Sequence, residues 1–240
     1  KVTDFLSSGD FSCLNSNPSS NHTSGKNSKK SINSVTEFLL STFNLSDSHS
    51  IFYSSGATES INTFFRLSKS DLMIYVVSDH SAVTAMADFN KYQGVEVISL
   101  EVDKNGSVDI SKLESTLNET SKNVYLNLTL VHNENGYIFD LTQILDLKNK
   151  YKFILHVDAV QSVMKFNGWD NLSSEIDIIS YSAHKFGALK GIGFSFVKSN
   201  FKFSPLINGG GQQNGLRSGT ENPLGIYSIQ LALEDLIENS

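Results

Sequence analysis

Two short segments place a lysine and an acid where both could act on one aromatic ring. Lys185 stands beside His184, just past the strand-like segment 176–181. Asp158 directly follows a second apolar segment, 153–157. A lysine amine forms a Schiff base with an aldehyde, and a carboxylate keeps the nitrogen of a pyridine ring protonated. The pair therefore predicts a site for pyridoxal 5'-phosphate (PLP), with Lys185 as the covalent carrier and Asp158 as the group that tunes the ring.

Each of these residues also has an ordinary interpretation. A lysine is normally an exposed, solvated charge, and Lys190 is a second lysine close by. Asp158 could instead cap the start of a helix, a common role for aspartate. A buried acid at a strand end, however, needs a partner or a shifted pKa, and a protonated ring nitrogen would be that partner. Gln161 lies one helical turn further on and would reach the same ring edge.

A glycine turn earlier in the chain is suited to a phosphate group. Gly56 permits a tight turn, and a helical pattern begins at Ala57. The amino end of a helix carries partial positive charge and free N–H donors, and Thr58 adds a hydroxyl. An ordinary helix cap, with Glu59 in the first turn, explains the same residues. The neighbouring lysine motif makes the phosphate interpretation the favoured one.

Polar side chains after other apolar segments complete the candidate site: His80, Asn133, Ser182 and His184. The imidazole of His80 could stack on a flat ring or move a proton near it, although a lone histidine after a strand is more often a loop residue. The amide of Asn133 could donate a hydrogen bond to a ring oxygen, and the Asn-Gly pair that follows also predicts a turn. Ser182 and His184 could bind the phosphate.

A glycine-rich segment, 208–222, contains the anion-binding side chains Arg217, Ser218 and Thr220. A flexible linker is the alternative interpretation. The Arg-Ser-Gly-Thr run, placed after three successive glycines, favours a binding loop.

The elements that must position these residues alternate along the chain between strand-like apolar runs and segments with helical spacing. This order predicts an α/β fold, with a mainly parallel seven-stranded sheet and helices on both faces. Ligands of such sheets bind beyond the carboxyl ends of the strands, where the candidate residues fall. The predicted strands are 50–53, 72–77, 95–100, 124–130, 153–157, 176–181 and 193–197, and the predicted helices are 31–43, 57–67, 82–92, 110–117, 141–150 and 224–238.

Three parts are expected along the chain. Residues 1–30 are rich in Ser, Asn and Gly and are predicted to be an N-terminal loop segment. Residues 31–223 form the predicted PLP-binding large domain. Residues 224–240 are predicted to be a helix that leads toward a small C-terminal domain, which is absent from this sequence.

The composition excludes several classes of protein. The 240 residues are 39% hydrophobic and 18% charged, which is typical of a soluble globular protein. A formal net charge of -6 argues against a broad nucleic-acid surface. Cys13 is the only cysteine, which excludes an internal disulfide framework and a cysteine-rich metal site, and no metal is expected. No apolar run approaches the roughly 20 residues that span a bilayer, so we expect a cytoplasmic protein.

Together these segments resemble the cysteine desulfurases, the NifS/IscS-like branch of the class V aminotransferases among fold-type I PLP enzymes. The matching segments follow the family order over nearly the whole chain. They are Asn17-Pro-Ser-Ser20, Ser55-Gly-Ala-Thr-Glu-Ser60, Asp79-His80, Asn133-Glu134, His156-Val-Asp-Ala-Val-Gln161, Ser182-Ala-His-Lys185, Lys190-Gly-Ile-Gly193, and Gly209-Gly-Gly with Leu216-Arg-Ser-Gly-Thr-Glu-Asn222.

The resemblance implies a role for each candidate residue. Lys185 carries the cofactor, Asp158 pairs with the pyridine nitrogen, and His80 stacks on the ring. The ring-oxygen side is contacted by Asn133 and Gln161, and the phosphate is held by Thr58, Ser182 and His184. Gly56 and Ala57 are also expected to bind the cofactor. Because family members are homodimers, Thr220 is expected to reach the phosphate of the neighbouring subunit.

The resemblance also implies a reaction. Sulfur is taken from L-cysteine, which leaves L-alanine and a persulfide for iron–sulfur cluster or thio-cofactor assembly. A sulfur-acceptor or scaffold protein is then a further partner. The alternatives are another class V PLP reaction, such as transamination, β-elimination or selenocysteine lysis, and a non-catalytic shortened homologue that acts with a full-length enzyme.

The sequence departs from the family pattern at several positions. His132 stands where asparagine is usual, Leu189 stands where proline is usual, and no Leu-Asp-Asn-Asn-Ala-like strand precedes Asn17. In the family, the nucleophilic cysteine and an arginine for the substrate carboxylate come from a region beyond Asn239. Cys13 lies where the family has no catalytic cysteine. We therefore expect this chain to bind PLP but to have little or no desulfurase turnover alone.

Overall fold

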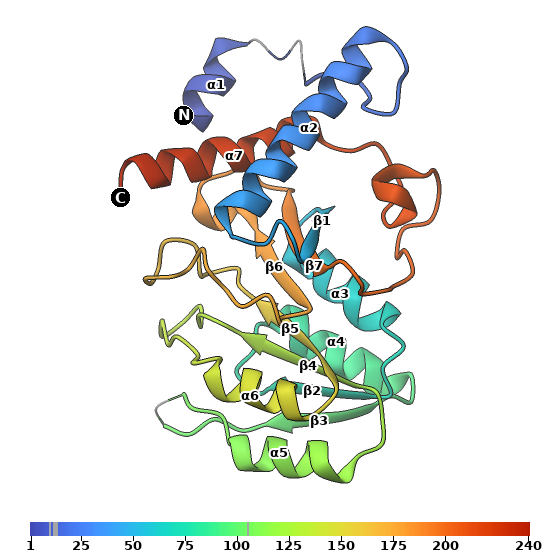
Figure 1. Cartoon of the computed structure of the whole chain (residues 1–240), viewed down its shortest axis with the longest axis vertical. Coiled ribbons are helices and arrows are strands. Elements are labelled where there is room, and N and C mark those ends of the chain that lie inside the picture. The colour runs from blue at the N-terminus through green and yellow to red at the C-terminus, as the bar shows by residue number, and fades with distance from the viewer. Residues whose placement is uncertain (10, 12–13, 105) are drawn as a thin grey trace.

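A single seven-stranded sheet runs through the centre of the molecule in the computed structural model, which describes residues 1–9, 11, 14–104 and 106–240 (Figure 1). The strand order is β1-β7-β6-β5-β4-β2-β3. Neighbours among β2 to β6 pair in parallel, and β7 runs antiparallel to both β1 and β6. The strands are β1 (His49–Ser54), β2 (Leu72–Val76), β3 (Glu96–Leu100), β4 (Val124–Thr129), β5 (Phe153–Asp158), β6 (Ile178–Ser182) and β7 (Gly193–Lys198). The predicted mainly parallel seven-stranded sheet is confirmed.

Helices cover both faces of this sheet. On one face, α2, α5, α6 and α7 supply residues to the larger core cluster, and on the other face α3 and α4 supply residues to the smaller one. The helices are α1 (Val2–Ser8), α2 (Thr23–Thr42), α3 (Ala57–Leu67), α4 (Ser81–Tyr92), α5 (Ile110–Glu119), α6 (Thr142–Lys150) and α7 (Pro223–Glu238), with short 3-10 turns η1 (Ala183–Phe186) and η2 (Gln212–Gly215). Successive strand residues enter opposite clusters, as Tyr125 and Leu126 do, and so the central strands read as continuous apolar runs.

The N-terminal part is more helical than the sequence pattern indicated. The loop predicted over residues 1–30 is wrong for α1 and for the first eight residues of α2. The His22 side chain accepts a hydrogen bond from the Gly25 N–H at 3.2 Å and caps α2 there. The buried face of this first part consists of Gly25 and Ser28, which an apolar periodicity does not detect. Cys13 lies outside the described residues, and the division into a loop segment, a large domain and a C-terminal helix stays a prediction.

The two terminal regions pack together at one end of the molecule. α2 crosses α7 there, and α1 lies against α7 (Figure 1). The Phe5 ring contacts the Tyr227 ring edge-on, with 5.2 Å between centroids. Among the helices in the described residues, none combines the length and the apolar character that crossing a membrane requires.

A close backbone contact sets β7 against the turn that precedes α3. A Cβ atom on Gly193 would lie 2.6 Å from the Gly56 Cα and 2.7 Å from the Tyr181 carbonyl oxygen. The backbone at Gly56 and the backbone at Tyr181 can move away from such a Cβ atom only at a cost in free energy. Gly193→Ala is therefore expected to lower the free energy of unfolding by about 2 kcal/mol. Urea denaturation would measure this loss. Gly211→Ala is the matched control, since nothing lies within 4 Å of its Cβ and its φ is -83°; equal stabilities of the two variants would contradict the prediction.

Candidate functional site

The carboxyl ends of the parallel strands enclose a cavity of about 240 Å³. Its lining contains every predicted cofactor-binding residue except Gly56 and Thr220. The lining residues are Ala57, Thr58, Ile61, His80, Ala82, Thr129, Val131, Asn133, Asp158, Val160, Gln161, Ser182, His184 and Lys185. The strand-end rule therefore brought residues from five separate segments into one cavity, while the role of each residue stays a prediction.

Asp158 and Lys185 enter this cavity from neighbouring strands. Asp158 is the last residue of β5 and is only 4% exposed, and Lys185 lies in the turn that follows β6. Burial raises the pKa of Asp158 to about 6, and one hydrogen bond from the Val160 N–H, at 3.0 Å, opposes that rise. A buried carboxyl with one hydrogen-bond donor would gain from a cationic partner in the cavity.

The short turn η1 explains why Lys185 is available. Ala183 and Phe186 are buried at i and i+3, so they anchor the turn and leave His184 and Lys185 between them on its exposed side. Gly187 ends the turn with a φ of 101°, in the left-handed region. Burial, followed by the charges of the nearby lysines, lowers the pKa of His184 from its ordinary value.

The amino end of α3 forms another part of the wall. The Ala57 N–H donates to the Ser182 hydroxyl oxygen at 2.8 Å, which joins α3 to the end of β6. Because that oxygen is the acceptor here, its own proton stays available to an anion in the cavity. Thr58 is exposed beside it in the first turn. The Ser182 hydroxyl proton and Thr58 are donors of the kind that a phosphate group requires at a helix terminus.

His80 is another lining residue, and it is held by its own helix. Its Nδ1 accepts from the Ala82 N–H at 3.1 Å, so the proton of the neutral ring is on Nε2. The buried Asp79 carboxylate accepts from the Val76 N–H at 3.1 Å and from the Thr129 N–H at 2.9 Å. Burial raises the pKa of Asp79 to about 6 in spite of these hydrogen bonds. Asp79 thereby links β2 to β4 below the cavity.

Asn133 reaches the cavity from a turn that the Asn-Gly pair predicted. Gly136 has a φ of 71°, and its N–H donates to the His132 carbonyl oxygen at 3.0 Å. The His132 ring Nε2 lies 3.0 Å from the Ser78 carbonyl oxygen, so the residue that replaces the usual asparagine ties this turn to the segment before His80.

Several lining residues were not anticipated from the sequence. Thr129, Val131 and Val160 lie at or just beyond strand ends, where the cavity forms, and the remaining two come from helices α3 and α4: Ile61 and Ala82. The strand-end rule alone would have indicated Thr129, whereas an apolar side chain carries no chemical signal by which it could be found.

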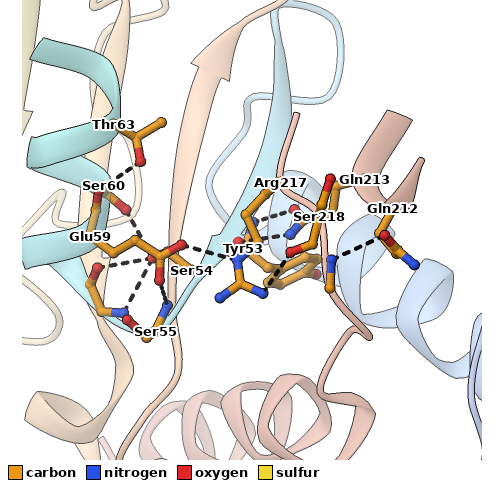
Figure 2. Close-up of polar contacts among 12 residues, drawn as sticks. Tyr53, Ser54, Ser55, Glu59, Ser60, Thr63, Gln212, Gln213, Arg217 and Ser218 are labelled. Atoms are coloured by element: carbon orange, nitrogen blue, oxygen red, sulfur yellow. Dashed lines mark hydrogen bonds and ion pairs between the residues drawn. The ribbon is translucent and has the colours of Figure 1, made fainter. Parts of the chain in front are cut away.

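The glycine-rich segment 208–222 is attached to the body of the chain (Figure 2). The Gln213 side-chain amide pairs with both backbone groups of Tyr53, accepting from its N–H at 2.7 Å and donating to its carbonyl at 2.8 Å. Arg217 Nε donates to Glu59 Oε1 at 3.0 Å. The segment is therefore a tethered loop rather than a flexible linker. Thr220 is exposed and lies outside the cavity of its own chain.

Comparisons with known proteins agree with this geometry. The model of the aminotransferase class-V family matches residues 8–239. The cysteine desulfurase IscS of Clostridium botulinum is 31% identical over 229 residues, which cover 93% of this chain and 57% of that protein. The IscS of Vibrio campbellii is 36% identical over 213 residues, which cover 85% of this chain and 52% of that protein. The chain thus spans little more than half the length of these relatives.

Solved structures show the same fold. The NifS-like protein of Rickettsia africae has a TM-score of 0.85 and 27% identity, over 99% of this chain and 65% of that one. SspA in complex with cysteine has a TM-score of 0.83 and 27% identity, over 97% of this chain and 68% of that one. These matches confirm the predicted large-domain fold of the fold-type I PLP enzymes.

Proposed function

Because the chain belongs to the class-V aminotransferase family, whose members are PLP-dependent, we propose that it binds PLP in the cavity and takes part in cysteine desulfurase chemistry. L-cysteine is the proposed substrate, and L-alanine and a persulfide are the proposed products. The support for this substrate comes from the relatives, which are named cysteine desulfurases.

One observation carries the proposal: Asp158 and Lys185 line the same cavity. The fit to PLP can be tested on the residues themselves. A buried carboxyl whose pKa is raised to about 6 suits a protonated ring nitrogen, which would supply the missing positive partner. The Ser182 hydroxyl and the amino end of α3, which also line the cavity, suit the phosphate.

The residues of the chain divide the work as follows. PLP, when bound, supplies an aromatic ring that withdraws electrons from the substrate. Lys185 Nζ would hold the aldehyde carbon covalently, and Asp158 would keep the ring nitrogen protonated. His80 would stack on the ring with its Nε2 proton directed away from the Ala82 N–H, and Gln161 and Asn133 would donate to the ring oxygen.

The partners follow from the same proposal. A second copy of the chain would bring Thr220 to the phosphate, for which the exposure of Thr220 outside its own cavity is the support. A sulfur-acceptor or scaffold protein would receive the persulfide sulfur. Cys13 is the only cysteine in the 240 residues, and its position matches no catalytic cysteine of the family. We propose that these residues alone bind PLP and L-cysteine with little desulfurase turnover, and that they act in the cytoplasm.

A two-stage titration tests the proposal. Addition of PLP to the 240-residue polypeptide is expected to produce the absorbance band of a lysine adduct, and addition of L-cysteine is then expected to change that band while L-serine at the same concentration does not. A spectrum that stays equal to the sum of its components contradicts PLP binding. An equal response to both amino acids contradicts the substrate, and formation of pyruvate or another keto acid would instead indicate a different PLP reaction.

A further inference from the structure

An ion pair joins the first turn of α3, where the phosphate is proposed to bind, to the glycine-rich segment 208–222 (Figure 2). Glu59 directly follows Thr58 in the first turn of α3, and its Oε2 accepts from the Ser55 N–H at 2.8 Å. Its other oxygen, Oε1, accepts from Arg217 at 3.0 Å. The side chains of Glu59 and Arg217 are 11% and 24% exposed, so water screens the pair only partly.

Glu59 is charged in this setting. Burial alone would raise its pKa, but the hydrogen bonds from Arg217 and Ser55 outweigh burial, and the pKa of Glu59 is lowered from its ordinary value. A full negative charge therefore stands in the same helical turn as Thr58, whose side chain is exposed to the cavity, and close in the chain to Ala57, which is bonded to the Ser182 hydroxyl. By itself this carboxylate would repel a phosphate group from that turn.

Arg217 removes the repulsion, and the loop holds Arg217 in place. Gln213, four residues earlier, is fixed to the backbone of Tyr53 by two hydrogen bonds of its side chain. Gln213 and Asn214 both have left-handed backbones, with φ of 47° and 57°, a conformation that costs free energy in residues other than glycine. A strained, doubly tethered loop of this kind keeps a guanidinium next to Glu59 instead of in solvent.

We infer that Arg217 is a positioning residue for the phosphate of the cofactor: it neutralises Glu59 and so opens the amino end of α3 to a dianion. The Glu59 carboxylate has a separate structural role, because it accepts the hydrogen bond from the Ser55 N–H and so stabilises the turn. The inference rests on the proposed function, since it takes the phosphate of PLP as the ligand. It also makes the glycine-rich loop a determinant of how the chain distinguishes PLP from pyridoxal, which lacks the phosphate.

A double-mutant cycle read with both ligands tests the inference. Dissociation constants for PLP and for pyridoxal would be measured for the wild type, Arg217→Gln, Glu59→Gln and the double variant. Arg217→Gln is expected to weaken PLP about tenfold, because it leaves a buried carboxylate unpaired beside the phosphate, and to change pyridoxal by less than about twofold. Glu59→Gln is expected to cause no loss of PLP affinity, and the double variant to recover to within about threefold of the wild type.

A merely structural tether gives a different pattern. In that case Arg217→Gln would weaken the binding of PLP and of pyridoxal equally, and the double variant would bind PLP as weakly as Arg217→Gln does. Either result overturns the inference, whereas PLP binding by the wild type would still support the proposed function. Arg66→Gln removes the same charge from the far end of α3 and is expected to leave PLP affinity unchanged. If Arg217→Gln does not fold, Arg217→Lys is measured in its place, because it keeps the positive charge. Its PLP affinity is expected to stay within about threefold of the wild type. A tenfold loss of PLP affinity in this variant would contradict the neutralising role. A wild type that binds no PLP overturns both this inference and the proposed function.

Discussion

Lys185→Ala is expected to abolish the covalent adduct with PLP, whereas Lys190→Ala is expected to leave it intact. Lys185 lines the cavity and lies between the buried anchors of η1, while Lys190 is an exposed residue outside the cavity. When the ring nitrogen of PLP faces Asp158, only the Lys185 amine can reach the aldehyde carbon of the cofactor. The expected effect is complete loss of adduct, because no second amine lines the cavity among the residues that the structure describes.

Reduction with borohydride followed by peptide mass spectrometry would measure this effect. The wild type and Lys190→Ala should carry the mass of the reduced cofactor on the peptide that contains position 185. Lys185→Ala should carry none, and its unchanged thermal unfolding would show that the fold is intact. An adduct found on Lys190 in the wild type would refute the assignment of the carrier.

Asp158→Asn is expected to stabilise the cofactor-free protein at pH 7 and to weaken PLP binding. The folded-state pKa of about 6 lies above the ordinary value of 3.8. For an acid with a raised pKa, the favourable contribution to folding is complete below the unfolded value and is lost as the pH rises through the folded value. The charged carboxyl therefore costs up to about 3 kcal/mol at pH 7, which the amide avoids while its oxygen still accepts from the Val160 N–H.

Chemical denaturation at pH 7.5 and at pH 4 would measure the change. The stabilising effect should be large at pH 7.5 and small at pH 4, where the native carboxyl is protonated. Asp177→Asn is the control of opposite sign, since Asp177 accepts from Lys148 Nζ at 2.5 Å and from the Leu155 N–H at 2.8 Å, and its loss should destabilise. An Asp158→Asn variant that is less stable than the wild type at pH 7.5, or that binds PLP as tightly, would contradict the role given to this carboxyl.

The fold was largely predictable because its signals are local. The helix predicted over residues 57–67 has those bounds in the structure, since its apolar spacing lies within the segment and the glycine that marks its start directly precedes it. The start of α2 was not predictable, because Gly25 and Ser28 face the core there and are neither apolar nor helix-favouring. At Gly25, α2 passes so close to the preceding chain that a Cβ there would lie 2.6 Å from the Ser20 backbone oxygen.

The residues of the candidate site and of the loop beside it also fall into two groups: those that the sequence could predict and those that it could not. Residues such as Asp158 and Lys185 carry chemistry in their own side chains and stand at strand ends, so their convergence followed from the topology of a parallel sheet. The contact between Gln213 and Tyr53 spans 160 positions and depends on where the loop returns to the sheet. No local pattern could indicate that a glutamine amide would pair with a distant backbone.

That glutamine also bears on how the molecule behaves at high concentration. β1 is one of the two outermost strands, and the N–H and carbonyl of its Tyr53 point away from β7. Backbone groups of this kind recruit a strand from a neighbouring molecule and seed aggregation. Gln213 occupies both backbone groups of Tyr53, as an added strand would. This part of the sheet edge is therefore unavailable for strand pairing between molecules.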